Sequence, residues 1–252
     1  MATNNNTDQD RLPTLQEQYF NYIDSISSKP IKFNKFQPLK PYRICPIHRF
    51  TSIEHLMFIL EHIHKTKAYS IHTERVSQDG PVVLIKIELK QIEELENFVL
   101  LFEMLHLPSQ HEQSFSTIRI LLNAIFLPQN KIFVWNHNTT NDLYALLHQQ
   151  YLSSITFNTI NIIEVQQSFK QWHDRRLKQT DQQWTIESAI NYLFMESIQT
   201  FNQATICPLY QMNYSVCYCL ALSKLSMIIE LDWTLEQVEQ YKKFPRDIII
   251  IS

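Results

Sequence analysis

Runs of apolar residues, separated by polar stretches, predict strands along much of the chain. Residues 68–73 and 82–89 are rich in β-branched and aromatic side chains and flank a polar stretch, so they predict two antiparallel strands joined by a turn. The continuous apolar run 98–102 suits a third strand that is buried on both faces. Residues 131–135 and 159–165 predict two further strands.

Apolar residues at helical spacing lie between and after the later strands. Thr51 to Glu54 forms a capping-box pattern, which predicts a helix to about Lys65 with Met57 on its apolar stripe. Further helices are expected over residues 12–26, 114–125, 138–149, 184–190 and 214–231, whereas the polar run 168–183 is interpreted as a surface loop or a frayed helix. Three successive strands, then strands alternating with helices, predict an α/β fold. Its mixed sheet has antiparallel first strands, parallel later strands and helices on both faces.

Composition narrows the class of protein. The 252 residues are 44% apolar, enough for a sizeable core, and the net charge of −3 gives no global basic field. A single glycine excludes the P-loop and the Rossmann fingerprint, which need several. There is no apolar N-terminal run, no apolar stretch of roughly 18 residues and no dense set of cysteines. We therefore expect no membrane association and an intracellular location, cytoplasmic or nuclear.

The first fifty residues differ from the rest. Residues 29–49 carry six Lys or Arg side chains, no acid, three aromatic residues and four prolines. A basic, extended, aromatic segment can follow a phosphate backbone and stack on bases, with Lys35, Lys40 and Arg43 as candidates. The alternative is an ordinary linker along the domain surface. We expect residues 1–50 to form an extension, with a short helix, and residues 51–252 to form the domain.

Polar side chains stand where two predicted strands end. His72 and Glu74 lie two residues apart at the end of the first strand, so they share one face, and Thr73 lies on the other. The segment from Asn136 to Asp142 follows the fourth strand and opens a helix. These two segments place metal-capable side chains next to a buried sheet.

A third segment completes a set of motifs. Tyr214 and Tyr218 are four residues apart and so lie on one face of the predicted helix. The chain resembles the DEDD family of 3′-5′ exonucleases, which have a ribonuclease H-like fold. The first motif of the family is Asp-x-Glu on a strand that is followed by a turn and a second apolar strand, and here His72 stands at the Asp and Glu74 at the Glu. The second motif is His-Asn-x-x-x-Asp after a strand, and the third is Tyr-x-x-x-Asp on a helix, where Tyr218 stands at the Asp. The resemblance covers about residues 69–229, and residues 184–190 are similar to a ribonuclease D-like segment.

The resemblance implies roles for individual residues. Tyr214 would orient the attacking water in an active relative, and His137 and Asn138 match the second motif. The metal-binding positions of the family are held here by His72, Glu74, Asp142 and Tyr218. Side chains that would contact nucleic acid under this resemblance include His137, Asn138, Arg175 and Arg176.

Two of the four metal positions have lost their carboxylate. Members of the family cut phosphodiesters with two divalent ions about 3.5–4 Å apart. His72 carries no negative charge and cannot bridge two ions, and Tyr218 is a neutral phenol near neutral pH. We expect no tight pair of magnesium ions, and we favour a site with no metal ion. The alternative is one divalent ion, magnesium or a softer ion such as manganese or zinc, held by Glu74 and Asp142 with His72.

Three functions follow from this reading. The leading hypothesis is an exonuclease-like protein that binds single-stranded RNA or DNA and has impaired or lost phosphodiester hydrolysis. The second is a protein-interaction scaffold with no nucleic-acid role, which the net charge of −3 allows. The third is a weak nuclease with a single metal ion.

Overall fold

A six-stranded mixed sheet forms the centre of the molecule. The computed structural model describes residues 33–91, 93–177, 183–198 and 208–243, and for residues 208–215 it describes the backbone alone; the helix expected at 12–26 lies outside them. In spatial order the strands are β2 (Tyr42–Ile47), β5 (Asn97–Glu103), β4 (Val82–Leu89), β3 (Ala68–Arg75), β6 (Lys131–Val134) and β7 (Ile162–Glu164).

The strand directions confirm the predicted fold class. β3, β4 and β5 are successive antiparallel neighbours, and β6 and β7 run parallel to β3. β7 covers only three residues of the longer strand expected over 159–165. His72 and Glu74 both lie in β3, between β4 and β6.

β2 comes from the segment that the sequence assigned to an extension. It runs parallel to β5 along the sheet edge, in register from Tyr42 opposite Asn97 to Ile47 opposite Phe102. Cys45 and Ile47 alternate into the core and are buried, which explains why this part of the segment belongs to the sheet. The sheet therefore begins before the boundary expected at residue 51.

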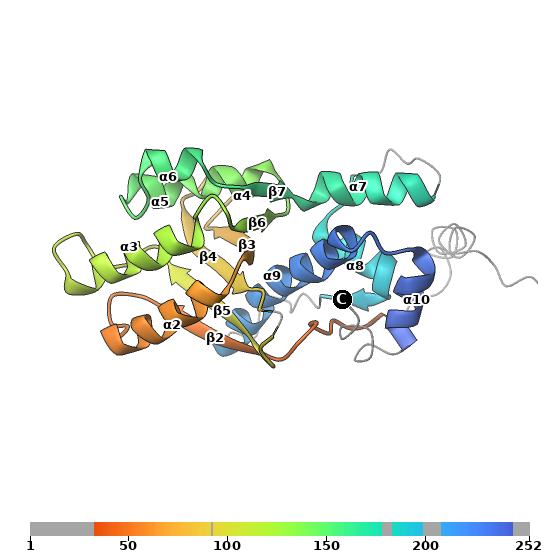
Figure 1. The fold of residues 1–252 in the computed structure, drawn as a ribbon, viewed down its shortest axis with the longest axis horizontal. Helices are drawn as coiled ribbons and strands as arrows, with labels where there is room; N and C mark the ends of the chain where they lie inside the picture. The colour runs from red at the N-terminus through yellow and green to blue at the C-terminus, as the bar shows by residue number, and fades with distance from the viewer. Residues whose placement is uncertain (1–32, 92, 178–182, 199–207, 244–252) are drawn as a thin grey trace, which may run out of the picture.

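One face of the sheet is covered by the helices that follow the early and middle strands. Figure 1 shows them at one end and along one side of the molecule. They are α2 (Ile53–Lys65), α3 (Gln113–Ile125), α4 (His137–Asp142), α5 (Tyr144–His148) and α6 (Ser154–Asn158). The expected helix over 138–149 is thus two short helices that meet at Leu143.

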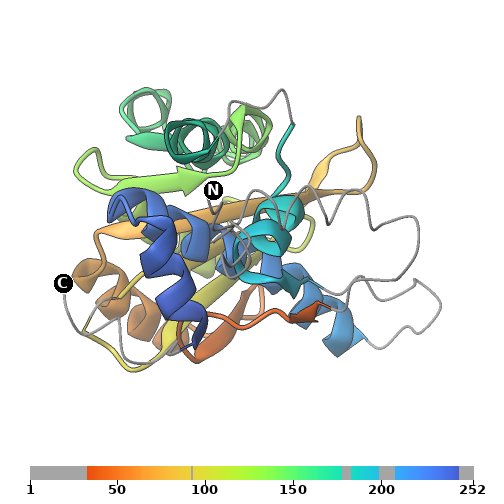
Figure 2. The same cartoon turned by 90° about the vertical axis from the view of Figure 1, so that its right-hand side faces the viewer.

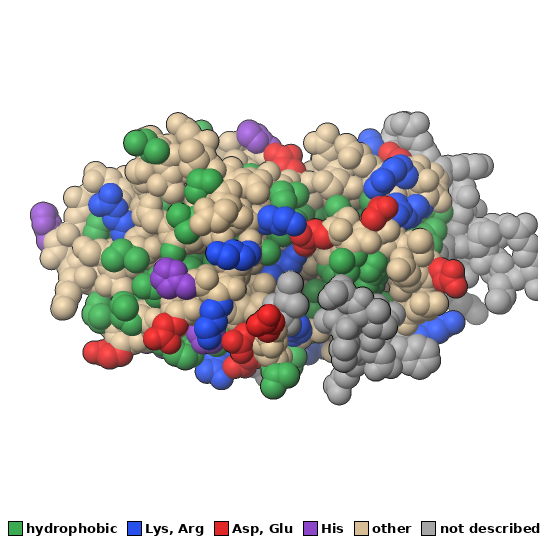
Figure 3. Space-filling view, viewed as in Figure 1, with side chains coloured by type: hydrophobic (Ala, Val, Ile, Leu, Met, Phe, Trp, Pro, Cys, Tyr) green, Lys and Arg blue, Asp and Glu red, His purple; other side chains and the backbone are tan. Residues whose placement is uncertain are grey.

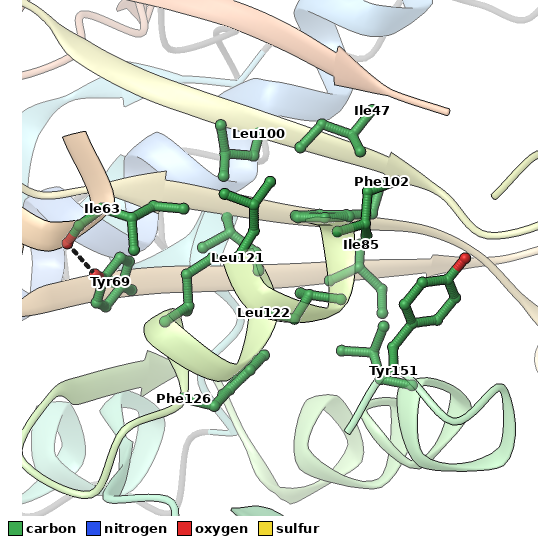
Figure 4. Close-up of a cluster of buried hydrophobic side chains, with 14 of the residues drawn as sticks. Ile47, Ile63, Tyr69, Ile85, Leu100, Phe102, Leu121, Leu122, Phe126 and Tyr151 are labelled. Carbon is green, nitrogen blue, oxygen red and sulfur yellow. Dashed lines mark hydrogen bonds between the residues drawn. The ribbon is translucent and has the colours of Figure 1, made fainter. Parts of the chain in front are cut away.

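The core on this face contains closely packed aliphatic and aromatic side chains from α2, α3 and the strands (Figure 4). Tyr69 is fully buried there, and its hydroxyl donates to the carbonyl of Ile63 at 3.0 Å. This bond satisfies the one polar atom of an otherwise apolar side chain.

The start and the apolar face of α2 differ from the sequence prediction. The N-cap is Ser52, whose hydroxyl accepts from the amide of His55 at 3.2 Å, whereas the hydroxyl of Thr51 accepts from the amide of His48. The expected box from Thr51 to Glu54 is therefore one residue too early. Met57, expected on the inward stripe, is 48% exposed.

The opposite face is covered by α7 (Val165–Arg176), α8 (Ile186–Phe194), α9 (Pro208–Glu230) and α10 (Leu235–Lys243). The loop or frayed helix expected over 168–183 is wrong for its first half, because α7 is a regular helix. Its side chains Phe169 and Trp172 are buried, and the indole of Trp172 donates to the carbonyl of Trp233 at 2.8 Å.

A small second sheet lies beside this face. It pairs β1 (Asn34–Lys35) in parallel with β8 (Glu196–Ser197), directly after α8 (Figure 2). None of the helices in the described residues combines the length and the apolar character needed to cross a membrane.

Candidate functional site

The end of β3 presents different side chains to the two layers of helices. His72 stands opposite Lys86 of β4, and its ring stacks on the ring of Tyr218 from α9 with a centroid distance of 5.2 Å and an interplanar angle of 22°. Glu74 lies on the same face, where it pairs with Lys86. The structure thus brings three of the predicted site residues, His72, Glu74 and Tyr218, to one face of the sheet beneath α9.

His72 is a neutral, buried ring. Burial and the nearby ammonium of Lys86 hold its pKa well below the usual 6.5. Its Nδ1 atom is buried and has no hydrogen-bond partner among the side chains that the structure describes. A neutral ring stacked on a phenol adds no negative charge to the site.

Lys86 is the residue that most changes the electrostatics of this face. Its side chain is fully buried, and its ammonium lies 2.5 Å from a carboxylate oxygen of Glu74. Burial lowers the pKa of Lys86, and the negative charge of Glu74 opposes that shift. The carboxylate of Glu74 is therefore already bound by a cation from the chain itself.

Asp142 approaches β3 from the other side. Its helix, α4, begins after Asn136, whose side chain accepts from the amide of Asn138 at 3.1 Å. The carboxylate of Asp142 accepts a short hydrogen bond from the hydroxyl of Thr73. Because Thr73 alternates with His72 and Glu74, Asp142 contacts the opposite face of the strand from Glu74.

Asp142 also has its own cation. The guanidinium of Arg75 lies 2.5 Å from its Oδ1 atom, and the Nε of Arg75 donates to the same oxygen at 2.7 Å. The side chain of Asp142 is 9% exposed and that of Arg75 is 35% exposed. The sequence-based expectation that Glu74 and Asp142 act together at one metal site stays a prediction.

The arrangement of these donors does not fit a pair of magnesium ions. Hard divalent ions need several converging oxygen ligands with excess negative charge. Among the described residues, no group of three or more His, Cys, Asp or Glu side chains is placed to hold a metal ion. Only the backbone of Tyr214 is described, so its expected role stays a prediction.

The candidate nucleic-acid contacts of the N-terminal segment and of the second motif lie at the surface. His137 is exposed, with its Nδ1 atom 3.6 Å from Glu164, and Asn138 is exposed in the first turn of α4. The ammonium of Lys40 donates to two backbone carbonyls, those of Gln91 and Glu94, at 2.7 and 3.1 Å.

Arg43, Arg175 and Arg176 are engaged with acidic partners. Arg43 pairs with Glu96 at 2.6 Å, and both arginines of α7 pair with Asp232, at 3.2 and 2.9 Å. Figure 3 shows basic and acidic side chains interspersed over one face rather than gathered by sign. Lys35, in β1, is exposed.

Sequence reasoning missed Lys86, Arg75 and Thr73. A lysine within the apolar run 82–89 was a usable signal, because lysine is almost never fully buried unless it is paired. The partners of Asp142 could not be read from the sequence, since they depend on how α4 is placed against β3.

The order and direction of the strands, with α9 packed across the central ones, define the fold of the DEDD 3′-5′ exonucleases, which is ribonuclease H-like. A scan against family models and a search of curated proteins found no match. Among solved structures, Escherichia coli RNase D, an exoribonuclease involved in structured RNA processing, is similar with a TM-score of 0.51 and 14% identity. The match covers 82% of this chain and 51% of RNase D, so the chain spans about half its length.

The EXD2 exonuclease domain matches less closely. The form soaked in Mn and Mg has a TM-score of 0.38 and 10% identity, over 82% of this chain and 98% of that chain. The form soaked in Mg and GMP has a TM-score of 0.37 and 11% identity, and the match covers 81% of this chain and 97% of that chain.

Proposed function

We propose that the protein is an exonuclease-like, nucleic-acid-binding protein whose two-metal hydrolysis of phosphodiesters is impaired or lost. One observation carries this proposal. Glu74 and Asp142, the carboxylates left at the motif positions, are each paired with a cation of the chain and contact opposite faces of β3.

The charge balance explains why hydrolysis would fail. A pair of divalent ions brings four positive charges, which active sites of this kind offset with converging carboxylates. Here the buried ammonium of Lys86 lies within 2.5 Å of Glu74 and would repel an incoming ion. A metal ion would have to displace Lys86 from Glu74 and Arg75 from Asp142.

A cleavage assay tests this part of the proposal. The protein is incubated with 3′-labelled single-stranded RNA and DNA and with magnesium or manganese, beside a Glu74→Gln/Asp142→Asn double variant. We expect no 3′ trimming by the wild-type chain beyond that of the double variant. Robust trimming that the double variant loses would overturn the proposed impairment.

Binding of single strands is the second part of the proposal. It is supported by the fold shared with RNase D, an exoribonuclease, and by the exposed basic and polar side chains Arg175, His137 and Asn138. Binding that is carried by phosphate contacts weakens steeply with salt. Arg175→Ala should lower the salt slope by about one relative to a Lys67→Ala control, because it removes one phosphate contact.

A protein-interaction scaffold remains the second candidate, and a specific observation favours it. Lys40, Arg43, Arg175 and Arg176 all have intramolecular partners, which reduces their capacity to bind phosphates. The salt titration separates the two functions. Absence of binding to single strands at low salt would refute the nucleic-acid role and support the scaffold.

A further inference from the structure

A hollow of about 840 Å³ lies where the small sheet meets α9 and α10. Its walls come from β1 and the following loop to residue 41, from the end of α8 with β8, and from α9 and α10. In Figure 1, α8 and α10 lie at the end of the molecule away from α2 and α3, and Figure 2 views this end. The volume is in the usual range for sites that bind small molecules, roughly 300–1,000 Å³.

Two residues that line the hollow, Lys224 and Glu196, form an ion pair with each other. The ammonium of Lys224 is buried and donates to both carboxylate oxygens of Glu196 at 2.8 Å and to the carbonyl of Gln37 at 3.0 Å. These bonds use all three donors of the lysine. The single acid of the lining is therefore neutralised by one of its lysines, and neither has to be offset by a ligand.

Three further lysines line the hollow and give it a positive excess. The ammonium of Lys40 donates to the carbonyls of Gln91 and Glu94, and the carboxylates of Glu88 and Glu94, which are not part of the lining, act on its charge. Lys242 pairs with Glu239, which is not part of the lining, and keeps two more donors. Lys35 is exposed and makes no salt bridge within the described part of the chain.

The remaining lining suits the rest of a small organic ligand. Apolar surface comes from Pro38, Leu39 and Met195, and neutral polar side chains come from Asn34 and Gln37. A multiply charged anion gains most from several lysines on one wall, and phosphate groups carry nearly two negative charges near neutral pH.

We propose that this hollow binds a small organic phosphate with two or more negative charges, of about the size of a mononucleotide. The proposal goes beyond the function proposed above, because the hollow is lined by none of the residues at the four metal positions; two of its lysines, Lys35 and Lys40, are also candidates for contacting nucleic acid. The phosphate can belong to a free metabolite or to the 5′ end of a strand, and both share the chemistry that the lysines would recognise.

Calorimetric titration at low salt with AMP and inorganic pyrophosphate tests the proposal. The variant is Lys35→Glu/Lys242→Glu, and the control is Lys67→Glu/Lys170→Glu, which changes the net charge equally at two exposed lysines outside the hollow. We expect the wild-type chain to bind at least one of the two probes. The hollow variant should bind it at least about tenfold more weakly, and the control within about twofold of wild type.

Two results would overturn the proposal: no binding of either probe by the wild-type chain, or equal weakening in both double variants. Thermal unfolding of each variant establishes that it is folded before it is titrated. A 5′-phosphorylated octanucleotide, compared with its unphosphorylated form, then distinguishes the two sources. Preference for the phosphorylated strand that disappears in the hollow variant supports a strand end, and binding of AMP alone supports a free metabolite.

Discussion

Glu88, a buried carboxylate of β4, should make the stability of the protein depend on pH. It is 1% exposed and faces α9, where its carboxylate accepts a short hydrogen bond from the hydroxyl of Ser223 and a bond of 2.7 Å from the side-chain amide of Asn97. Burial raises its pKa from 4.5 to about 7, although these bonds and the charges of Lys90 and Lys40 oppose the rise. Glu88 therefore lies in the layer that holds α9, the helix of Tyr218, against the sheet.

The raised pKa sets both the sign and the size of the effect. The folded state binds the proton of Glu88 more tightly than the unfolded state does, so the carboxyl favours folding below about pH 4.5 and loses this contribution as pH rises through 7. At about 1.4 kcal/mol per pKa unit, the full loss is about 3 kcal/mol. Between pH 5 and pH 8 the loss is about 2.5 kcal/mol, because part of it has already occurred at pH 5.

Glu88→Gln removes the titrating group and keeps hydrogen-bonding capacity at the same place. Urea unfolding of the wild-type chain and the variant, measured from pH 5 to pH 8, should show the variant gaining about 2.5 kcal/mol relative to wild type over that range. Buried His72 and His173, whose pKa values are lowered, contribute with the opposite sign, and they cancel in this comparison.

An exposed carboxyl serves as the matched control. Glu61→Gln, on α2, makes the same change of side chain at an exposed position, so the pH dependence that burial gives Glu88 is measured as the excess of Glu88→Gln over Glu61→Gln from pH 5 to pH 8. The reasoning about Glu88 is refuted if this excess is absent, since that would mean that Glu88 titrates alike in the folded and unfolded states.

Three further predictions about the packing are tested by chemical denaturation. Ser52→Ala should cost about 1 kcal/mol because it removes the N-cap of α2; an unchanged midpoint would contradict that role. Trp172→Ala should cost about 3–5 kcal/mol and Gln171→Ala under about 0.5 kcal/mol; similar costs would mean that α7 does not pack on the core. His72→Phe should not destabilise, because it keeps the stack on Tyr218 and removes a buried nitrogen that has no hydrogen-bond partner in the described part of the chain; a clear loss of stability would show that Nδ1 is satisfied.

The strands and most helices could be predicted because their apolar residues repeat with a clear period. The helix α7 could not be predicted, because glutamines and charged residues surround its inward side chains such as Phe169 and Trp172. Too few apolar residues are left to show a helical period. The strand β2 was likewise not predicted. The prolines and lysines in and around Tyr42 to Ile47 indicated an extended surface segment, and the alternating apolar pattern is short. In both cases packing against a neighbouring element decides the structure, and local sequence does not.

The candidate site could be predicted as a set of positions but not as a set of partners. The period of a strand placed His72 and Glu74 on one face, and the resemblance to the exonuclease family implied that Tyr218 lies beside them. The pairing of Glu74 with Lys86 depends on the register between β3 and β4, and that of Asp142 with Arg75 depends on where α4 lies. Neither is encoded in the spacing of residues along the chain.

The ion pairs of Glu74 with Lys86 and of Asp142 with Arg75 leave the end of β3 without the excess negative charge that a pair of divalent ions needs. Glu74 and Asp142 contribute two negative charges, and Lys86 and Arg75 contribute two positive charges in direct contact with them. The pKa of His72 lies well below its usual value because the ring is buried near Lys86, and this ring stacks on that of Tyr218. Because ammonium and guanidinium groups already bind these carboxylates, an aspartate in place of His72 or Tyr218 would be buried without either cation as a partner, at a high desolvation cost.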